Sequence, residues 1–214
     1  HEAGIQVHML TGDHPSTAVA IAQQVGILHG KSFDAVMTAR EFDAVPPERP
    51  LARLPLVVSR CTPETKVALL ERLHRSGHYV AMTGDGVNDA PAIKRADIGV
   101  SMGVAGSEVT KEASDIVLAD DSFATIVVAV REGRTIFLNI RKFILHLLAG
   151  NLAETIVFVL AILVGFDPPL SALQILWLNT ATSTPPAIGL GMEPPPRNVM
   201  KSGKSVRAGL FSRE

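Results

Sequence analysis

The stretch AMTGDGVNDAPAIK (81–94) ends an apolar run and decides how the first half of the chain is interpreted. It crowds three oxygen-bearing side chains together, those of Asp85, Asn88 and Asp89. Carboxylates this close repel one another and are costly to bury, so we expect a cation or a strong hydrogen-bond donor among them. Carboxylate and amide oxygens are the ligands that Mg²⁺ prefers, which predicts a magnesium site here. The alternative is an Asx turn in which Asp89 caps a helix that holds Pro91.

Strand-like and helix-like patterns alternate over the first 120 residues. We expect a helix over 16–26 and another that is capped by Thr62, starts at Pro63 and runs to Ser76-Gly77. A segment with three prolines, residues 29–53, is expected to form a looped insertion. The predicted strands cover 5–10, 54–60, 78–83, 98–103 and 115–120. This alternation predicts an α/β fold with a doubly wound parallel sheet, which binds ligands at the carboxyl ends of its strands.

Two similar motifs fall at such strand ends, Thr11-Gly12-Asp13 and Thr83-Gly84-Asp85. A Thr hydroxyl and free backbone N–H groups at the start of a helix form a natural cradle for phosphate. Lys66 lies in the first turn of its helix, where the helix dipole disfavours a cation unless a phosphate approaches from that side. The alternative for Lys66 is a solvated surface lysine.

Two long apolar runs in the second half, 143–166 and 170–192, are candidate membrane spans. The only charged residue between them is Asp167, whereas basic residues flank the pair on both sides. This distribution predicts a hairpin with both ends in the cytoplasm. The alternative is a buried hairpin of a soluble protein. The flanking basic residues are Arg131, Arg134, Arg141 and Lys142 before the pair, and Arg197, Lys201 and Lys204 after it.

Each candidate span carries polar side chains that suit a cation. Asn151 and Glu154 are three residues apart and share a helix face. An ionisable residue at mid-membrane costs roughly 2.5–3.5 kcal/mol, so we expect Glu154 to line a cavity or bind a cation. Pro185-Pro186 in the second span would free backbone carbonyls, as in broken helices that bind ions. The alternative is a kinked helix with interhelical polar contacts. The polar residues of the second span are Asn179, Thr182 and Ser183.

The overall composition excludes some function classes. A net charge of −1 and an isoelectric point near 6.7 give no electrostatic reason to expect a nucleic-acid partner. The single cysteine, Cys61, excludes an internal disulfide. The first residue is His1, and we expect the chain to be a segment of a longer protein.

Five stretches together resemble the P-type cation-transporting ATPases, in order and over almost the whole chain. They are MLTGDHPSTAVAIAQQVGI, SRCTPETK, MTGDGVNDAPAIKRADIGVSMG, EASDIVLADDSFATIVVAVREGR and LWLNTATSTPPAIGLG. The resemblance implies that residues 1–125 are the C-terminal part of a phosphorylation domain of haloacid-dehalogenase type. It further implies a stalk helix over 126–142, membrane helices five and six within 143–192, and a cytoplasmic loop over 193–214.

The resemblance also implies roles for single residues. Asp85 would bind Mg²⁺ with support from Asn88 and Asp89, and Lys66 would lie near the phosphates of ATP. Thr11, Gly12 and Asp13 match a phosphate-site motif, so these residues and Lys66 would steady the transferred phosphoryl group, and Arg60 matches a position near the nucleotide. Positions of the transported cation match Asn151, Glu154, Asn179 and Thr182, with Ser183 beside them.

The sequence departs from the family pattern in two ways. The phosphorylated aspartate of the family's DKTGT motif does not occur in the chain, and neither do the nucleotide-binding and actuator domains. Calcium and sodium–potassium pumps carry an aspartate where this chain has Ser183, which favours the fungal-type sodium/potassium efflux branch. Glu154 stands where that branch has a glutamine, which argues against assigning the chain to that branch.

We therefore expect a segment of an ATP-driven membrane pump that works through an aspartyl-phosphate and is inactive alone. Na⁺ or K⁺ is favoured as the exported ion over Ca²⁺, and the plasma membrane over an internal membrane. The expected partners are the lipid bilayer and the remainder of the same pump. One alternative is a truncated, non-catalytic membrane protein that modulates an intact pump. Another is a soluble phosphatase of the same fold.

Overall fold

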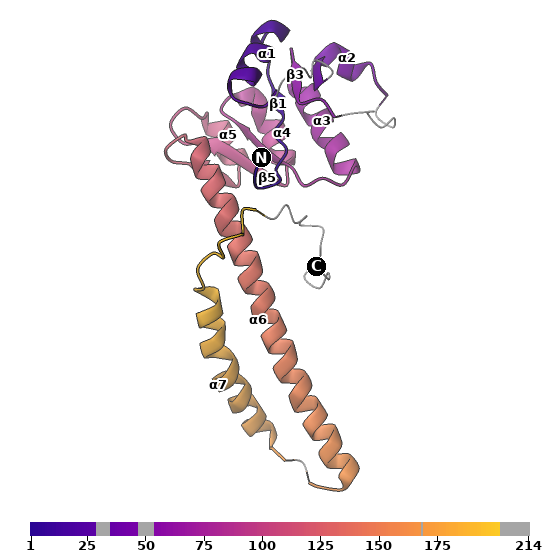
Figure 1. Cartoon of the computed structure of the whole chain (residues 1–214), viewed down its shortest axis with the longest axis vertical. Helices are drawn as coiled ribbons and strands as arrows, with labels where there is room; N and C mark the ends of the chain where they lie inside the picture. Colours follow the sequence, from indigo (N-terminus) through magenta and orange to yellow (C-terminus); the bar gives the residue numbers. More distant parts are fainter. Residues whose placement is uncertain (29–34, 47–53, 168, 202–214) are drawn as a thin grey trace. The chain divides into compact units, whose positions relative to one another are not determined.

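The structure is a computed structural model, and it divides into two compact units, residues 1–126 and residues 127 onward. The residues that the structure describes are 1–28, 35–46, 54–167 and 169–201 (Figure 1).

The first sheet of unit 1 is built from β1 (Met9–Leu10), β2 (Val36–Thr38) and β3 (Val57–Ser59). The strands are parallel in the order β1-β3-β2, so β3 lies in the middle. Val57 is paired with Met9 on one side and with Val36 on the other.

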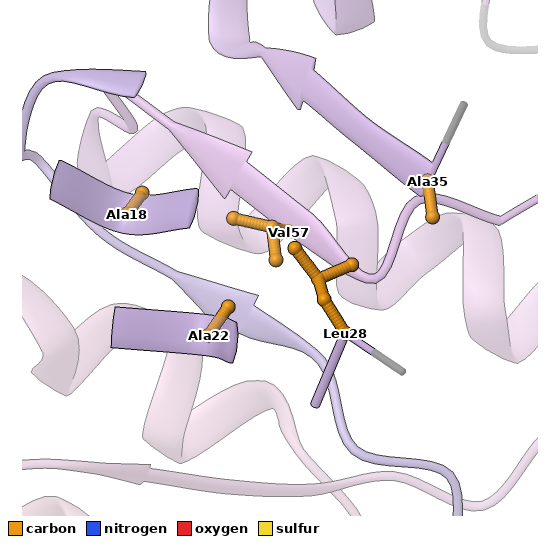
Figure 2. Close-up of a cluster of buried hydrophobic side chains, with 5 residues drawn as sticks. All are labelled: Ala18, Ala22, Leu28, Ala35 and Val57. Carbon is orange, nitrogen blue, oxygen red and sulfur yellow. The ribbon is translucent and has the colours of Figure 1, made fainter. Parts of the chain in front are cut away.

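Helices cover both faces of this sheet. Successive side chains of a strand point to opposite faces. Val57 packs with Ala18 and Ala22 of α1 (Pro15–Gln24), as Figure 2 shows. Its neighbour Val58 packs with α2 (Ala39–Asp43) and α3 (Pro63–Arg75) through Phe42, Leu69 and Leu73. The central strand is therefore buried between two helical layers, as expected for a doubly wound sheet.

The second sheet contains β4 (Ala81–Gly84), β5 (Ile98–Met102) and β6 (Ile116–Leu118), parallel and in that order. One face of β5 carries Val100 and Met102, which pack with Leu118. On the other face, α4 (Ala90–Arg95) approaches so closely that a Cβ on Gly99 would lie 2.7 Å from the Ile93 backbone oxygen. A short 3₁₀ helix, η2 (Val87–Asp89), precedes α4, and α5 (Glu108–Ala113) lies between β5 and β6.

The α/β fold with parallel strands is confirmed, but the expected single sheet is divided into two three-stranded sheets. The division falls between β1 and β4, each of which is an edge strand of its sheet and pairs on one side only among the described residues. Side chains join the two halves instead, because α3 contacts α4 through the ion pair of Glu71 with Arg95.

The helix predicted at Thr62 is confirmed, since the Thr62 hydroxyl accepts a hydrogen bond from the Thr65 N–H at 3.3 Å and Pro63 is the first helical residue. The strand predicted over 5–10 is wrong for residues 5–8. Only Met9 and Leu10 pair with β3, and the residues before them are largely exposed.

The interpretation of residues 29–53 as a looped insertion is also wrong. Within its described part, 35–46, the chain forms both β2 and α2. The α2 start has a capping box, in which the Thr38 N–H donates to the Glu41 carboxylate at 2.7 Å and the Glu41 N–H donates to the Thr38 hydroxyl at 3.3 Å. These bonds to Thr38 lower the pKa of the Glu41 carboxyl. The rest of this prediction lies outside the described residues.

Two helices make up most of the second half. The helix α6 (Phe123–Val164) begins in unit 1 and continues without a break for 42 residues. Judged by length and composition, it is the one helix in the described residues that is long and apolar enough to cross a membrane. The helix α7 (Ala172–Gly191) has a capping box at Ser171 and holds Pro185 and Pro186 inside it. Its polar middle lowers its hydropathy, so the second membrane span stays a prediction.

The segment after α7 is attached to α6 within unit 2. The side-chain amide of Asn139 donates to the Glu193 carbonyl at 3.0 Å, and Lys142 forms an ion pair with the Glu193 carboxylate at 2.5 Å. The Arg134 guanidinium donates to the Val199 carbonyl at 3.2 Å. Because Val199 is buried, residues 193–199 cover part of the α6 surface.

Candidate functional site

A cavity of about 390 Å³ lies at the carboxyl end of β4. Its polar lining includes one cation, Lys66 of α3, and the carboxylates of Asp85 and Asp89. Leu10, the last residue of β1, lines the same cavity, so the carboxyl ends of β1 and β4 both face it. The other lining residues are Met82, Thr83, Gly84, Met102, Ala105, Asp121 and Phe123.

The Lys66 ammonium group and the Asp89 carboxylate form an ion pair. Both side chains are largely withdrawn from solvent, with 14% and 12% of their surface exposed. The second carboxylate oxygen of Asp89 accepts the Gly86 N–H at 3.4 Å. Asp89 is the N-cap residue of α4, but its carboxylate accepts no hydrogen bond from an N–H group of that helix, so the side-chain capping of the alternative is absent.

Gly84 is required for this arrangement. A Cβ added there would lie 2.6 Å from the Cβ and Oδ2 of Asp89, closer than real Cβ atoms come to other heavy atoms. The TGDG sequence therefore lets the Asp89 side chain lie against the strand end. Glycine is needed at position 84 because the Asp89 side chain approaches the backbone there too closely to leave room for a Cβ.

Asp85 is the exposed acid of the group. Its main-chain carbonyl accepts the Ser107 N–H at 3.0 Å, which fixes the backbone. Within the described residues, no hydrogen bond or ion pair reaches its carboxylate, which leaves both oxygens available to a ligand. Thr83 adds a buried hydroxyl that has no hydrogen-bond partner in the described structure. Asn88 is exposed and is not among the residues that line the cavity.

The first TGD motif forms a separate loop after β1. The Thr11 hydroxyl donates to the Asp13 carboxylate at 3.0 Å and accepts the Asp13 N–H at 3.2 Å. Two main-chain bonds tie this loop to the turn after β3, from the Arg60 N–H to the Asp13 carbonyl and from the Cys61 N–H to the Thr11 carbonyl. Arg60 has a φ of 55°, unusual for a side chain of its size. Thr11, Gly12, Asp13 and Arg60 do not line the cavity, so the structure groups them beside Leu10.

Cys61 lies beside this loop. Burial raises the pKa of its thiol, and the positive charge of Lys66 offsets only part of the effect. The thiol donates a hydrogen bond to the Val58 carbonyl at 3.2 Å. A raised pKa lowers the share of thiolate, the nucleophilic form of the thiol, at neutral pH.

The residues present fit a magnesium ion that is shared with a phosphate. Mg²⁺ keeps several waters and is bound by one or two carboxylates together with substrate phosphates. Asp85 can supply one such carboxylate, whereas that of Asp89 is committed to Lys66. No group of three or more His, Cys, Asp or Glu side chains suited to a metal occurs in the described part of the chain. The site thus lacks an all-protein metal cage and suits a metal held jointly with a phosphate.

The polar residues predicted to hold a transported cation are divided between two helices. Asn151 and Glu154 lie on α6, whereas Asn179, Thr182 and Ser183 lie on α7. The hydrogen bonds described for these stretches stay within one helix, such as those from Thr155 to the Asn151 carbonyl and from Thr182 to the Leu178 carbonyl, both 2.8 Å. A cation site built from both helices stays a prediction.

Sequence reasoning assigned the motif of Thr83 to a phosphate cradle but did not single out Asp121 as a cavity residue. Thr83 had a usable signal, because it occupies the same place in its TGD motif as Thr11 does. Asp121 had none, since its position beside the cavity depends on how the turn after β6 folds back toward residues 104–105. The apolar lining from Met82, Met102 and Phe123 was likewise not expected.

Comparisons with known proteins match both halves of the chain. A family described as haloacid dehalogenase-like hydrolase matches residues 1–97, and one described as cation transporting ATPase, C-terminus, matches residues 167–214. The sodium/potassium exporting P-type ATPase cta3 of Schizosaccharomyces pombe is 49% identical over 94% of this chain and 21% of its own length. A calcium-transporting ATPase of Bacillus subtilis is 47% identical over 100% of this chain and 24% of its own length.

A solved structure is also similar. It is a zinc-transporting PIB-type ATPase in the E2.Pi state, with a TM-score of 0.57 and 26% identity, covering 92% of this chain and 25% of that chain. The chain thus spans about a fifth to a quarter of the length of the proteins it matches.

Proposed function

The chain is a homologue of the P-type cation-transporting ATPases, and we propose that it is the segment of such a pump that holds Mg²⁺ and phosphate and leads into the membrane. In the complete pump, ATP hydrolysis through an aspartyl-phosphate drives cation export. The cavity that gathers Lys66, Asp85 and the Thr83 hydroxyl is the observation that carries this proposal.

The cavity has the charges that phosphoryl transfer needs. Catalysis of this reaction is mainly positioning and electrostatic stabilisation of charge on the phosphoryl oxygens. Lys66 supplies a cation and Thr83 supplies a hydroxyl donor with no other partner. The Asp85 carboxylate would hold Mg²⁺, with Asn88 nearby and with Asp89 orienting Lys66. The metal, when bound, neutralises phosphate charge. Thr11, Gly12, Asp13 and Arg60 would contact the phosphates of ATP from the adjoining loop.

The nucleophile must come from another part of the pump. β1 and β4 each have one edge without a strand partner in the described residues, and both strand ends face the cavity. Unpaired parallel edges favour the addition of a strand. We infer that a strand absent from this chain inserts between them and presents the phosphorylated aspartate.

The second half would form the membrane hairpin. α6 is long and apolar enough to span, and we assign α7 as its partner, with 126–142 as the stalk and 193–214 as a cytoplasmic loop. Both ends would lie in the cytoplasm of a plasma-membrane pump. Asn151, Glu154, Asn179, Thr182 and Ser183 would contact the cation, for which we favour Na⁺ or K⁺ over Ca²⁺.

Labelling with γ-³²P-ATP tests the proposal directly. The full-length protein should form a phosphoenzyme that hydroxylamine cleaves, because an acyl phosphate reacts with this nucleophile. The 214-residue chain alone should form none, since it holds no DKTGT aspartate. Hydroxylamine-sensitive label on the isolated chain would show that the nucleophile lies within it and would reject the proposal. Absence of such label from the full-length protein would favour the non-catalytic alternative.

A further inference from the structure

Asp121 has a constrained backbone beside the cavity. Its φ of 50° lies in the left-handed region, which Asp tolerates better than most residues but which still carries strain. Its two carboxylate oxygens accept the main-chain N–H groups of Val104 at 3.0 Å and Ala105 at 2.7 Å. These bonds lower the pKa of the Asp121 carboxyl, so the side chain is ionised at neutral pH and the bonds are charge-assisted.

The loop that Asp121 holds, residues 103–107, has little freedom to adjust. A Cβ on Gly106 would lie 2.0 Å from the Met102 carbonyl oxygen, and one on Gly103 would lie 2.6 Å from the Leu118 carbonyl oxygen. The Gly103 N–H also donates to that Leu118 carbonyl at 2.8 Å. The loop backbone is therefore packed closely against Met102 and Leu118.

The far end of the same loop contacts the proposed metal ligand. The Ser107 N–H donates to the Asp85 carbonyl at 3.0 Å. Ser107 is in turn fixed as the cap of α5, because its hydroxyl accepts the Thr110 N–H at 3.2 Å. Loop 103–107 is therefore attached to Asp121 near its start and to the Asp85 backbone at its end.

We propose that Asp121 is a positioning residue for Asp85, which it acts on through loop 103–107. The carboxylate of Asp121 fixes the loop, and the loop fixes the backbone from which Asp85 presents its own carboxylate to a divalent cation. Asp121 also lies two residues before Phe123, where α6 starts, so the same contact ties the loop to the beginning of that helix. The inference rests on the proposed function, which assigns the metal to Asp85.

The test is the Mg²⁺ dependence of phosphoenzyme formation in the full-length protein. Replacing a residue that orients a metal ligand typically lowers metal affinity by about 10-fold to 100-fold. In Asp121→Asn, which suits the left-handed backbone, we expect the half-saturating Mg²⁺ concentration to rise about tenfold, with phosphorylation restored at high Mg²⁺. Asp121→Gly also suits that backbone and removes both acceptors, so its shift should be at least as large.

Asp120→Asn is the matched control. Asp120 bonds to the Ser122 N–H and the Thr125 hydroxyl at the start of α6 and does not hold the loop. Its Mg²⁺ dependence should stay as in the wild type. An unshifted Asp121→Asn, or an equal shift in both variants, would overturn the positioning role. Asp85→Asn is measured in parallel, because an unchanged Mg²⁺ dependence there would reject the metal assignment itself rather than the role of Asp121 alone.

Discussion

Lys66 and Asp89 form an ion pair that joins α3 to the turn after β4, and both side chains face the same cavity. The pair links two parts of unit 1 whose sheets are not hydrogen-bonded to each other. Its geometry explains why a lysine is tolerated in the first turn of α3, where the helix dipole is unfavourable, since the Asp89 carboxylate offsets that cost. A phosphate entering the cavity would meet an ammonium group that is already oriented.

Lys66→Ala should therefore lower both phosphorylation and stability in the full-length protein. Phosphorylation falls because a cation beside the phosphate is lost. Stability falls because a mostly buried Asp89 carboxylate is left without its partner, a change that costs about 3–5 kcal/mol for fully buried pairs. Phosphoenzyme formation from ATP and the midpoint of thermal unfolding are the two measurements.

The control for Lys66 is Lys94→Ala, because Lys94 is an exposed lysine on α4 outside the cavity. It should change neither quantity. The double variant Lys66→Ala with Asp89→Ala should recover part of the lost stability, since it no longer leaves a buried charge unpaired, but its phosphorylation should stay below that of the wild type. Wild-type phosphorylation in Lys66→Ala would remove Lys66 from the site.

Asp85→Asn should abolish phosphoenzyme formation and leave the fold nearly unchanged. The carboxylate is exposed and contributes no hydrogen bond within the described residues, whereas the main-chain bond from Ser107 does not depend on the side chain. The measurement pairs phosphorylation over a range of Mg²⁺ concentrations with thermal unfolding. Asp97→Asn, at a second exposed acid, should stay active. An active Asp85→Asn with normal Mg²⁺ dependence would contradict the assignment.

Much of this architecture could be predicted from local sequence signals. The Thr62-Pro63 start of α3 follows from capping chemistry, and the uninterrupted α6 follows from an amphipathic segment that continues into an apolar run without a helix breaker. The position of Asp85 and Asp89 after β4 agrees with the rule that the ends of parallel strands gather ligand-binding residues. These features depend on residues close together in the chain or on a general rule of sheet topology.

The errors have a different physical origin. Residues 36–43 were interpreted as a loop because prolines crowd the segment that follows, although Val36 and Met37 pair with β3 and Thr38 caps α2. The separation of β1 from β4 was missed because pairing depends on which strands are present to fill the space between them. Asp121 was missed because its hydrogen bonds join residues 16 and 17 positions apart, beyond any local pattern.

Gly84→Ala should damage the site through sterics alone. The added methyl group would lie 2.6 Å from Asp89 atoms, so the Asp89 side chain must move and its pairing with Lys66 must change. We expect lower phosphoenzyme formation and a lower unfolding midpoint. The matched control is Gly133→Ala on α6, where a Cβ meets nothing within 4 Å and alanine favours the helix by about 0.5–1 kcal/mol. Equal behaviour of the two variants would refute the close-approach explanation.

The last prediction concerns the transported ion. A Ca²⁺ site gathers several carboxylates among six to eight oxygens. In the stretches 143–164 and 172–191 of α6 and α7 the one carboxylate is Glu154, and the other candidate ligands are neutral oxygens of Asn151, Asn179, Thr182 and Ser183. A divalent ion with too little compensating charge is expensive in a low-dielectric site, so a monovalent ion suits these residues better. We expect Na⁺ or K⁺ to stimulate phosphoenzyme formation by the full-length pump more than Ca²⁺ does, and Glu154→Gln to raise the cation concentration needed for half-maximal stimulation.

Asp167→Asn, which neutralises the charge between the two helices, is the control and should leave that concentration unchanged. Phosphorylation driven by micromolar Ca²⁺ without Na⁺ or K⁺ would overturn the monovalent assignment, and an unchanged cation dependence in Glu154→Gln would exclude Glu154 from the transport site.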